Sequence, residues 1–327
     1  MDPLGRKLNS HFDKLLIQTP WGNHCTNHLL FIDDLKILAK TDEVLADMMK
    51  ETKKFFEVVG LEMNKEKSAT NSETCKKDAK ILEGVQGHKY LGITEDSNSV
   101  VMRESFDKIK ADILVRIERL CQSKLNGKNL IKAINEHALS VINYHIGLQR
   151  LDPKDFQEID HEVRQTLIKY RIYLQPACKE RLYLPRSNMG RGLHNIELIS
   201  ERMLLMLRNS LEKSKHLSTR RAAILYNESE CATHLSLIKH YLAEKYKING
   251  EVTTELLLKA QMNSLYSDIK QKTYHEKLYR SMRNNMISMI DSSSWLKRGN
   301  IKATHEAAYT FLQDRNIFPG KIERCPH

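Results

Sequence analysis

The 327-residue sequence has no long apolar run, and its cysteines show no paired spacing. No stretch approaches the ~20 apolar residues of a membrane-spanning helix, and the first residues contain no apolar core of signal-peptide length. The six cysteines are Cys25, Cys75, Cys121, Cys178, Cys231 and Cys325. Wide spacing of this kind is typical of free thiols in a reducing compartment. We therefore expect that the protein is neither secreted nor inserted into a membrane, and that it is located in the nucleus or cytoplasm.

Charge is unevenly distributed along the chain. The net charge is +11, and 41% of the residues are hydrophobic, which suits a globular chain of two or three domains. Residues 1–102 carry 14 basic and 16 acidic side chains, whereas residues 176–300 carry 21 basic and 12 acidic ones. A basic excess behind an acidic segment indicates that one part holds a polyanion and another processes it. The alternative is a basic surface that serves solubility alone.

Two short apolar runs flank the pair Asp33 and Asp34 in residues 28–39. Short apolar runs around residues that tolerate turn angles predict a β-hairpin with both carboxylates at its tip. Adjacent carboxylates repel each other, and a hard divalent cation such as Mg²⁺ relieves that repulsion. The alternative is that the two aspartates simply solvate an ordinary turn.

The segment around this hairpin predicts a small α/β arrangement. Leu4, Leu8 and Phe12 recur at helical spacing. Thr41 is a suitable N-cap for a helix over residues 42–59, and Gly60 is a suitable left-handed exit residue. The inner face of that helix is predicted to hold Leu45, Met48, Met49, Thr52, Phe56 and Val59. Alternation predicts strands at residues 61–64 and 88–93.

From residue 103 the apolar spacing is helical throughout. One helix is predicted from residue 103 until the Asn126-Gly127 pair, a second over residues 130–142, and a third to Leu167 that Asp152 caps and Pro153 opens. The inward faces are predicted to hold Phe106, Ile109, Ile113, Ile117 and Leu120 in the first helix, and Phe156, Ile159, Val163 and Leu167 in the third. A loop at residues 182–193 contains proline, glycines, Arg186 and Arg191. Glycine permits close approach and arginine pairs with phosphate, so the loop is a candidate nucleic-acid contact. A basic surface loop between two helices is the alternative, and residues 196–290 are expected to be helical.

Several of these segments, in this order, carry a resemblance. Residues 31–34, 60–68 and 88–93 are similar to three successive polymerase motifs of reverse transcriptases from LINE-type retrotransposons, which lack long terminal repeats. The loop at residues 184–193 resembles the segment after the thumb of these enzymes. Residues 295–299, with Glu306, Gln313 and Asp314, resemble the linker ahead of their C-terminal zinc knuckle. The resemblance spans most of the chain.

The resemblance implies roles for individual residues in an RNA-directed DNA polymerase. Asp33 and Asp34 match the metal-binding pair, where two Mg²⁺ ions would assist in-line displacement. Lys67 resembles the lysine that approaches the incoming triphosphate, although a solvated lysine is the alternative. Tyr90, Leu91 and Gly92 resemble the primer grip. The partners implied are an RNA template, a DNA primer and deoxynucleoside triphosphates.

The sequence also departs from the family pattern. A further metal-binding aspartate and a Gln-Gly segment, both expected upstream, have no match, so we expect a palm that begins partway through and lacks the fingers. Cys325 and His327 resemble the first ligands of an incomplete zinc knuckle, and zinc needs four ligands. The predicted fold is α+β: a partial palm with a small antiparallel sheet at residues 1–102, a helical thumb at 103–175 and a helical basic linker at 176–327.

Two other functions stay open at this point. The first is a catalytically inactive nucleic-acid-binding remnant of the same polymerase, which the missing aspartate favours for this chain in isolation. The second is a helical DNA-binding regulator with an unrelated amino-terminal domain, which would bind specific sequences without any need for Mg²⁺. Under the polymerase and remnant readings, residues 103–300 are expected to bind primed duplexes.

Overall fold

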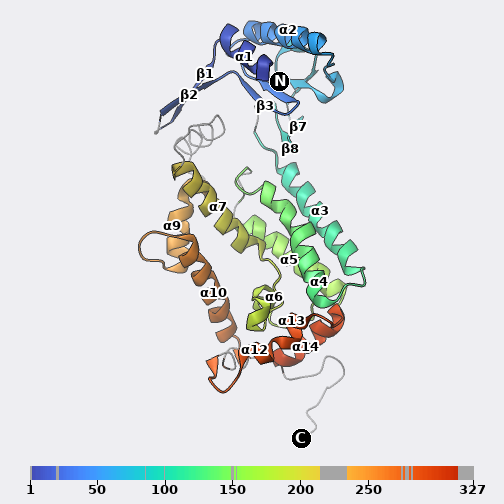
Figure 1. The fold of residues 1–327 in the computed structure, drawn as a ribbon, viewed down its shortest axis with the longest axis vertical. Helices are drawn as coiled ribbons and strands as arrows, with labels where there is room; N and C mark the ends of the chain where they lie inside the picture. The colour runs from blue at the N-terminus through green and yellow to red at the C-terminus, as the bar shows by residue number, and fades with distance from the viewer. Residues whose placement is uncertain are drawn as a thin grey trace. The chain divides into compact units, whose positions relative to one another are not determined.

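The chain divides into two compact units, residues 1–107 with 209–233, and residues 108–208 with 234–327. The structure, a computed structural model (Figure 1), describes residues 2–19, 22–84, 86–98, 100–148, 151, 153–213, 234–273, 275–276, 280 and 283–315. It is α+β, with helices and small, mostly antiparallel sheets, which confirms the predicted class at that level. The specific polymerase fold and the predicted domain boundaries stay predictions.

The first unit combines two α-helices with four two-stranded sheets. Its elements are α1 (Asp2–His11), β1 (Leu15–Thr19), β2 (Gly22–Thr26), β3 (His28–Phe31), β4 (Asp34–Ile37), α2 (Asp42–Val59), β5 (Ala69–Thr70), β6 (Lys80–Ile81), β7 (His88–Tyr90) and β8 (Ile93–Glu95). The pairs β1-β2, β3-β4 and β7-β8 are antiparallel, whereas β5-β6 is parallel. Short 3₁₀ turns lie at Lys65–Lys67 and Glu73–Cys75.

Helices α1 and α2 and the β3-β4 hairpin share one apolar core. Leu4, Leu8 and Met48 are fully buried at its centre, and Leu35 and Ile37 of β4 pack against them. The Thr41 side chain accepts a hydrogen bond from the Val44 backbone N–H, and Gly60 ends α2 in a left-handed conformation, both as predicted. Phe56 packs on the same core, also as predicted.

Three predictions in this unit are wrong. The strand predicted over residues 88–93 is two antiparallel strands, β7 and β8, because Leu91 and Gly92 have positive φ, which an extended strand does not allow. Val59 is 48% exposed, because the last turn of α2 extends past the core. Residues 61–64 form no strand, although their polarity alternates. The backbone that follows α2 instead leads into the 3₁₀ turn, which the Asn64 side chain caps, and alternation alone supplies no partner strand for a ladder.

The second unit is helical. Its elements are α3 (Arg103–Cys121, which begins in the first unit), α4 (Gly127–Ala133), α5 (Pro153–Lys169), α6 (Lys179–Tyr183), α7 (Ile196–Lys213, whose last residues are assigned to the first unit), α9 (His234–Tyr246), α10 (Thr254–Lys270), α12 (Met289–Ser292), α13 (Ser294–Arg298) and α14 (Ala303–Arg315). A π-helical turn (Ile134–Ala138), a 3₁₀ stretch (Leu139–Tyr144) and a 3₁₀ turn (Arg186–Asn188) complete it.

Helices α3 and α5 lie side by side (Figure 1) and are joined by ion pairs as well as by apolar packing. The Lys110 Nζ lies 2.6 Å from a Glu158 carboxylate oxygen and 2.9 Å from one of Glu162. Most of the predicted inward residues of both helices are buried: Phe106, Ile109, Ile113 and Ile117 of α3, and Phe156, Ile159, Val163 and Leu167 of α5. Leu120, also predicted to face inward, is only partly buried in the last turn of α3. The 3.6-residue spacing therefore predicted both faces correctly except at the last turn of α3.

The region between these helices differs from the prediction. α3 ends at Cys121, and Asn126 begins the next helix by accepting a hydrogen bond from the Asn129 backbone N–H. Asparagine is a strong N-cap, so the Asn126-Gly127 pair is a start signal here and not a stop signal. The predicted single helix over residues 130–142 consists of α-, π- and 3₁₀-helical turns in succession.

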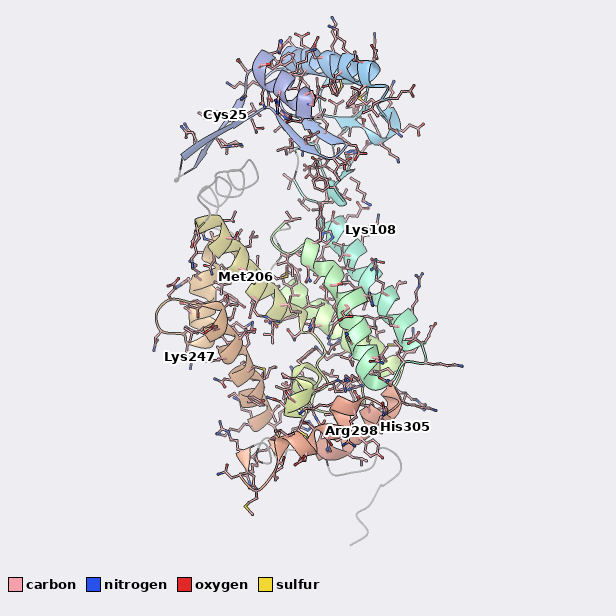
Figure 2. The ribbon with its side chains drawn as sticks, viewed as in Figure 1. Cys25, Lys108, Met206, Lys247, Arg298 and His305 are labelled. Carbon is pink, nitrogen blue, oxygen red and sulfur yellow. The ribbon has the colours of Figure 1, made fainter. Side chains whose placement is uncertain are left out.

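The four cysteines within the described residues are free thiols, as predicted. Cys25, labelled on the β1-β2 hairpin in Figure 2, is exposed, Cys75 and Cys178 are buried, and Cys121 is partly exposed. Cys231 and the proposed N-cap Asp152 lie outside the described residues. Among the helices that the structure describes, none has the length and hydropathy to cross a bilayer.

Candidate functional site

The tip of the β3-β4 hairpin holds the predicted carboxylates, with a small shift from the expected turn. Phe31 pairs with Asp34, so the two turn residues are Ile32 and Asp33, and Asp34 is the first residue of β4. Ile32 has φ +57° and is 75% exposed. Positive φ is rare and strained for a β-branched residue, so the chain holds an unfavourable conformation next to Asp33.

Strand alternation separates the two faces of β4. Leu35 and Ile37 pack against the core, so Asp34 and Lys36 lie on the opposite face, because successive side chains of a strand alternate. Lys36 Nζ lies 2.6 Å from Glu95 Oε2 of β8 and 5.3 Å from the centre of the Tyr90 ring of β7. This lysine therefore connects the hairpin that carries the aspartates to the strand pair that carries the predicted primer grip.

The predicted primer grip is a tight turn between β7 and β8. Tyr90 pairs with Ile93, and the two residues between them have φ +47° at Leu91 and +86° at Gly92. Positive φ at both central residues is the pattern of a type I′ hairpin turn, which follows the twist of its strands. Glycine adopts this conformation readily and leucine does not, so the strain lies at Leu91.

Lys67 ends the 3₁₀ turn that follows α2. The Asn64 side-chain oxygen accepts a hydrogen bond from the Lys67 backbone N–H at 3.1 Å. The spacing of three residues between asparagine and lysine is thus explained locally, because a capping side chain binds the N–H three positions on. This hydrogen bond fixes the Lys67 backbone and does not involve the Lys67 ammonium group.

These predicted residues come together around one cavity. A hollow of about 600 Å³ in the first unit is lined by Asp33, Asp34, Lys67 and Tyr90, which come from three separate segments of the sequence. Lys36, Asn64, His88 and Glu95 also line it, whereas Leu91 and Gly92 do not. The pKa of His88 is lowered, mainly by burial, so its ring is mostly neutral at pH 7.

The donor set at the hairpin tip fits a hard cation such as Mg²⁺. Both aspartates are exposed, and within the described residues neither carboxylate forms an ion pair. Mg²⁺ commonly takes one or two protein carboxylates and completes its shell with water and substrate phosphates. No group of three or more His, Cys, Asp or Glu side chains is arranged to hold a metal ion in the part of the chain that the structure describes.

The loop arginines lie in internal ion pairs of the second unit. Arg186 places its two Nη atoms 2.9 Å from the two carboxylate oxygens of Glu306, and Arg191 Nε lies 2.8 Å from Glu306 Oε1. Arg191 is 2% exposed and also donates to the Ile172 carbonyl. The sequence suggested an accessible loop, but Arg191 is buried. To contact a phosphate, either arginine would have to give up its ion pair with Glu306.

The close approach that glycine permits in this loop is internal as well. A Cβ atom on Gly190 would lie 1.9 Å from the Leu184 carbonyl oxygen, so no other residue fits without movement of the backbone. The loop folds back on itself through backbone hydrogen bonds from Arg191 to Arg181 and from Leu193 to Leu182.

A third arginine joins the same two regions. Arg181 Nη1 lies 3.0 Å from Asp314 Oδ1, and its Nη2 donates to the Gln313 side chain. Burial acts to raise the pKa of Glu306, but Arg191 and Arg186 outweigh burial and hold that pKa below its usual range. The arginine loop and the α14 carboxylates, two segments that carry the resemblance, are thus held together by buried charge pairs.

Sequence reasoning missed the residues that connect these parts. Lys36 and Glu95 lie 59 positions apart, and Arg191 and Glu306 lie 115 apart. Nothing in the local pattern pairs them. The candidate zinc ligands Cys325 and His327 lie outside the described residues.

No protein-family model matches the chain, and a comparison with curated proteins finds no match either. Any proposal about function is therefore argued from the residues and their arrangement in the structure.

Proposed function

We propose that the chain carries part of the catalytic site of an RNA-directed DNA polymerase, within the cavity at the β3-β4 hairpin. The observation that supports this most is the meeting of Asp33, Asp34, Lys67 and Tyr90 around one cavity. The resemblance of the sequence motifs implies that these residues serve in catalysis, nucleotide binding and primer binding. Their convergence is what such a site requires.

Each residue has a distinct task in this proposal. Asp33 and Asp34 would hold Mg²⁺, which would lower the pKa of the primer 3′-hydroxyl and steady the triphosphate. Lys67 donates to the triphosphate, and its capped backbone limits its movement. The Tyr90 to Gly92 turn positions the primer, and the Lys36 to Glu95 ion pair holds that turn against the hairpin.

Primer extension tests the proposal on the full chain with a primed RNA template, deoxynucleoside triphosphates and Mg²⁺. Because no upstream aspartate matches the further metal ligand of the family, we expect this chain in isolation to bind the duplex without extending it. Where that upstream segment is supplied, we expect a drop of at least ~10³-fold in Asp33→Asn, because one carboxylate cannot replace the pair. Asp47→Asn is the matched control, since Asp47 is exposed on α2 and does not line the cavity. Equal activity in the two variants would remove the role of Asp33.

Lys67 has an even closer control. Lys65 belongs to the same 3₁₀ turn and does not line the cavity. Lys67→Ala should raise KM for the nucleotide by about tenfold, the effect of losing one charged hydrogen bond, and Lys65→Ala should not. Duplex binding without any extension, even when the upstream segment is supplied, would favour the other candidate, a nucleic-acid-binding protein without polymerase activity.

A further inference from the structure

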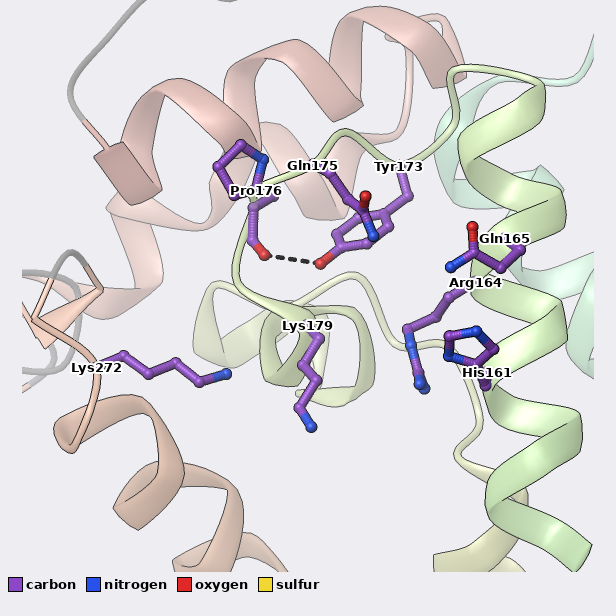
Figure 3. A pocket seen from close by; sticks show the side chains of 9 residues that line it. His161, Arg164, Gln165, Tyr173, Gln175, Pro176, Lys179 and Lys272 are labelled. Atoms are coloured by element: carbon purple, nitrogen blue, oxygen red, sulfur yellow. Dashed lines mark hydrogen bonds between the residues drawn. The ribbon is translucent and has the colours of Figure 1, made fainter.

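A second cavity lies wholly within the helical unit. Its volume is about 600 Å³, and it is bounded by α5, the connector after α5, α6 and Lys272, which lies two residues after α10. Figure 3 shows His161 and Arg164 on one side, Lys272 on the opposite side and Lys179 between them. The amides of Gln165 and Gln175 complete its polar wall.

The lining is cationic. Arg164, Lys179 and Lys272 contribute three positive charges, and none of the described residues that line the cavity is acidic. Lys272 is already compensated, because it forms an ion pair with the buried Glu180. Lys179 Nζ lies 3.8 Å from the other oxygen of Glu180 and its side chain is 56% exposed, so its charge is mostly available.

Arg164 is the second available charge. Its Nη1 donates to the Tyr183 hydroxyl at 2.6 Å, which orients the guanidinium group without neutralising it. The nearby Asp160 accepts hydrogen bonds from the backbone N–H groups of Ile196 and Glu197. Burial raises its pKa to about 7 while these bonds and the Arg164 charge lower it, so Asp160 offsets part of the Arg164 charge when it is ionised. The exposed Asp268 faces both lysines through solvent, where its effect is screened.

We propose that this pocket binds a phosphate group of a nucleic-acid strand, with Arg164 and Lys179 donating to its oxygens and Lys272 adding charge from the opposite side. An arginine held by one hydrogen bond and an exposed lysine are suited to phosphate, because guanidinium N–H groups fit its oxygens and ammonium adds a point charge. The volume exceeds that of a bare phosphate and leaves room for the adjoining sugar. The basic excess of residues 176–300 favours a strand over a free anion.

The inference rests on the proposed binding of nucleic acid and not on polymerase chemistry. Its test is therefore a binding titration with a labelled single-stranded oligonucleotide, measured by fluorescence anisotropy on the full chain at several salt concentrations. Lys179→Ala should weaken binding about fivefold to tenfold at ~0.1 M salt and reduce the log–log salt slope by about one. Lys132→Ala is the matched control, since it removes one charge from a 67% exposed lysine on α4 outside the pocket.

Comparing the two variants distinguishes a specific contribution of the pocket from a general effect of removing a surface charge. Weaker binding in Lys179→Ala but not in Lys132→Ala supports the proposal, and equal effects of the two variants overturn it. Binding of inorganic phosphate that depends on Lys179, together with oligonucleotide binding that does not, overturns the assignment to a strand. Primer extension, measured separately with Asp33→Asn, reports on the proposed polymerase site and is independent of these results.

Discussion

At the scale of single residues, the ion pairs around Glu306 show what the arginine loop does in the folded chain. A buried carboxylate is costly unless it is paired and hydrogen-bonded, and Glu306 has two arginines. Arg186 makes a bidentate contact and also donates to the Leu296 and Gly127 carbonyls. The pairs therefore join α14, α13 and α4 to the loop that follows α6.

Removing one partner of such a pair should destabilise the second unit. Arg191→Met keeps much of the side-chain volume but takes one cation from Glu306, and we expect a loss of about 3 kcal/mol in the free energy of unfolding. Urea denaturation followed by circular dichroism measures it. Arg280→Met, in an exposed pair with Glu276, should leave the denaturation midpoint unchanged. A loss below about 1 kcal/mol in Arg191→Met would show that the Glu306 cluster is not important for stability.

At the scale of elements, the hairpin that presents the aspartates carries backbone strain. An L-residue in the left-handed region costs about 1–2 kcal/mol, and Ile32 gains little in return because its side chain is exposed. Leu91 has positive φ in the other predicted site turn. Strained residues therefore lie in both turns of the candidate site, where strain is commonly retained for function.

Ile32→Gly should stabilise the first unit by about 0.5–1 kcal/mol, since the relief of strain exceeds the added chain entropy of glycine. Ile32→Ala is the control, because alanine keeps the Cβ atom that causes the strain and removes only exposed carbon atoms. Thermal denaturation of the three proteins compares them. If the glycine variant is no more stable than the alanine variant, positive φ at this position carries no cost.

How well the elements could be predicted depended on whether their signals are local. The α2 caps at Thr41 and Gly60, and the inner faces of α3 and α5, follow from spacing and from single capping residues, so they were predicted correctly. The predicted turn residues were Asp33 and Asp34, because aspartate tolerates turn angles better than isoleucine. The strand register instead places Ile32 and Asp33 in the turn, one residue earlier. Residues 61–64 alternate in polarity but have no partner strand. Alternation along one segment does not predict whether another strand lies beside it to form hydrogen bonds.

The candidate site was predicted in part for the same reason. Asp33, Lys67 and Tyr90 lie in short motifs that the sequence shows directly, and all three line one cavity. The pairs Lys36 with Glu95 and Arg191 with Glu306 depend on the tertiary fold, so no window of sequence contains them. The phosphate contacts predicted for Arg186 and Arg191 stay predictions, to be tested against the internal pairs that both side chains form.

At the scale of the whole molecule, charge and candidate chemistry are separated along the sequence. The aspartates lie in the segment with 16 acidic and 14 basic residues, and the basic excess begins after residue 102. If roughly five to eight lysine or arginine side chains contact phosphates, duplex affinity should fall with salt with a log–log slope of about −4 to −7, and depend little on base sequence. Titration of a labelled primed duplex across salt concentrations measures that slope.

The same titration tests whether the buried Arg191 contributes to the binding of nucleic acid. Arg191 is held by Glu306 and the Ile172 carbonyl, so Arg191→Met should leave the slope unchanged as long as circular dichroism shows a folded protein. A slope flatter by about one would mean that Arg191 leaves Glu306 to contact a phosphate when nucleic acid binds. A flat salt response in the wild-type chain would instead remove nucleic acid as a partner, because phosphate contacts always release counterions.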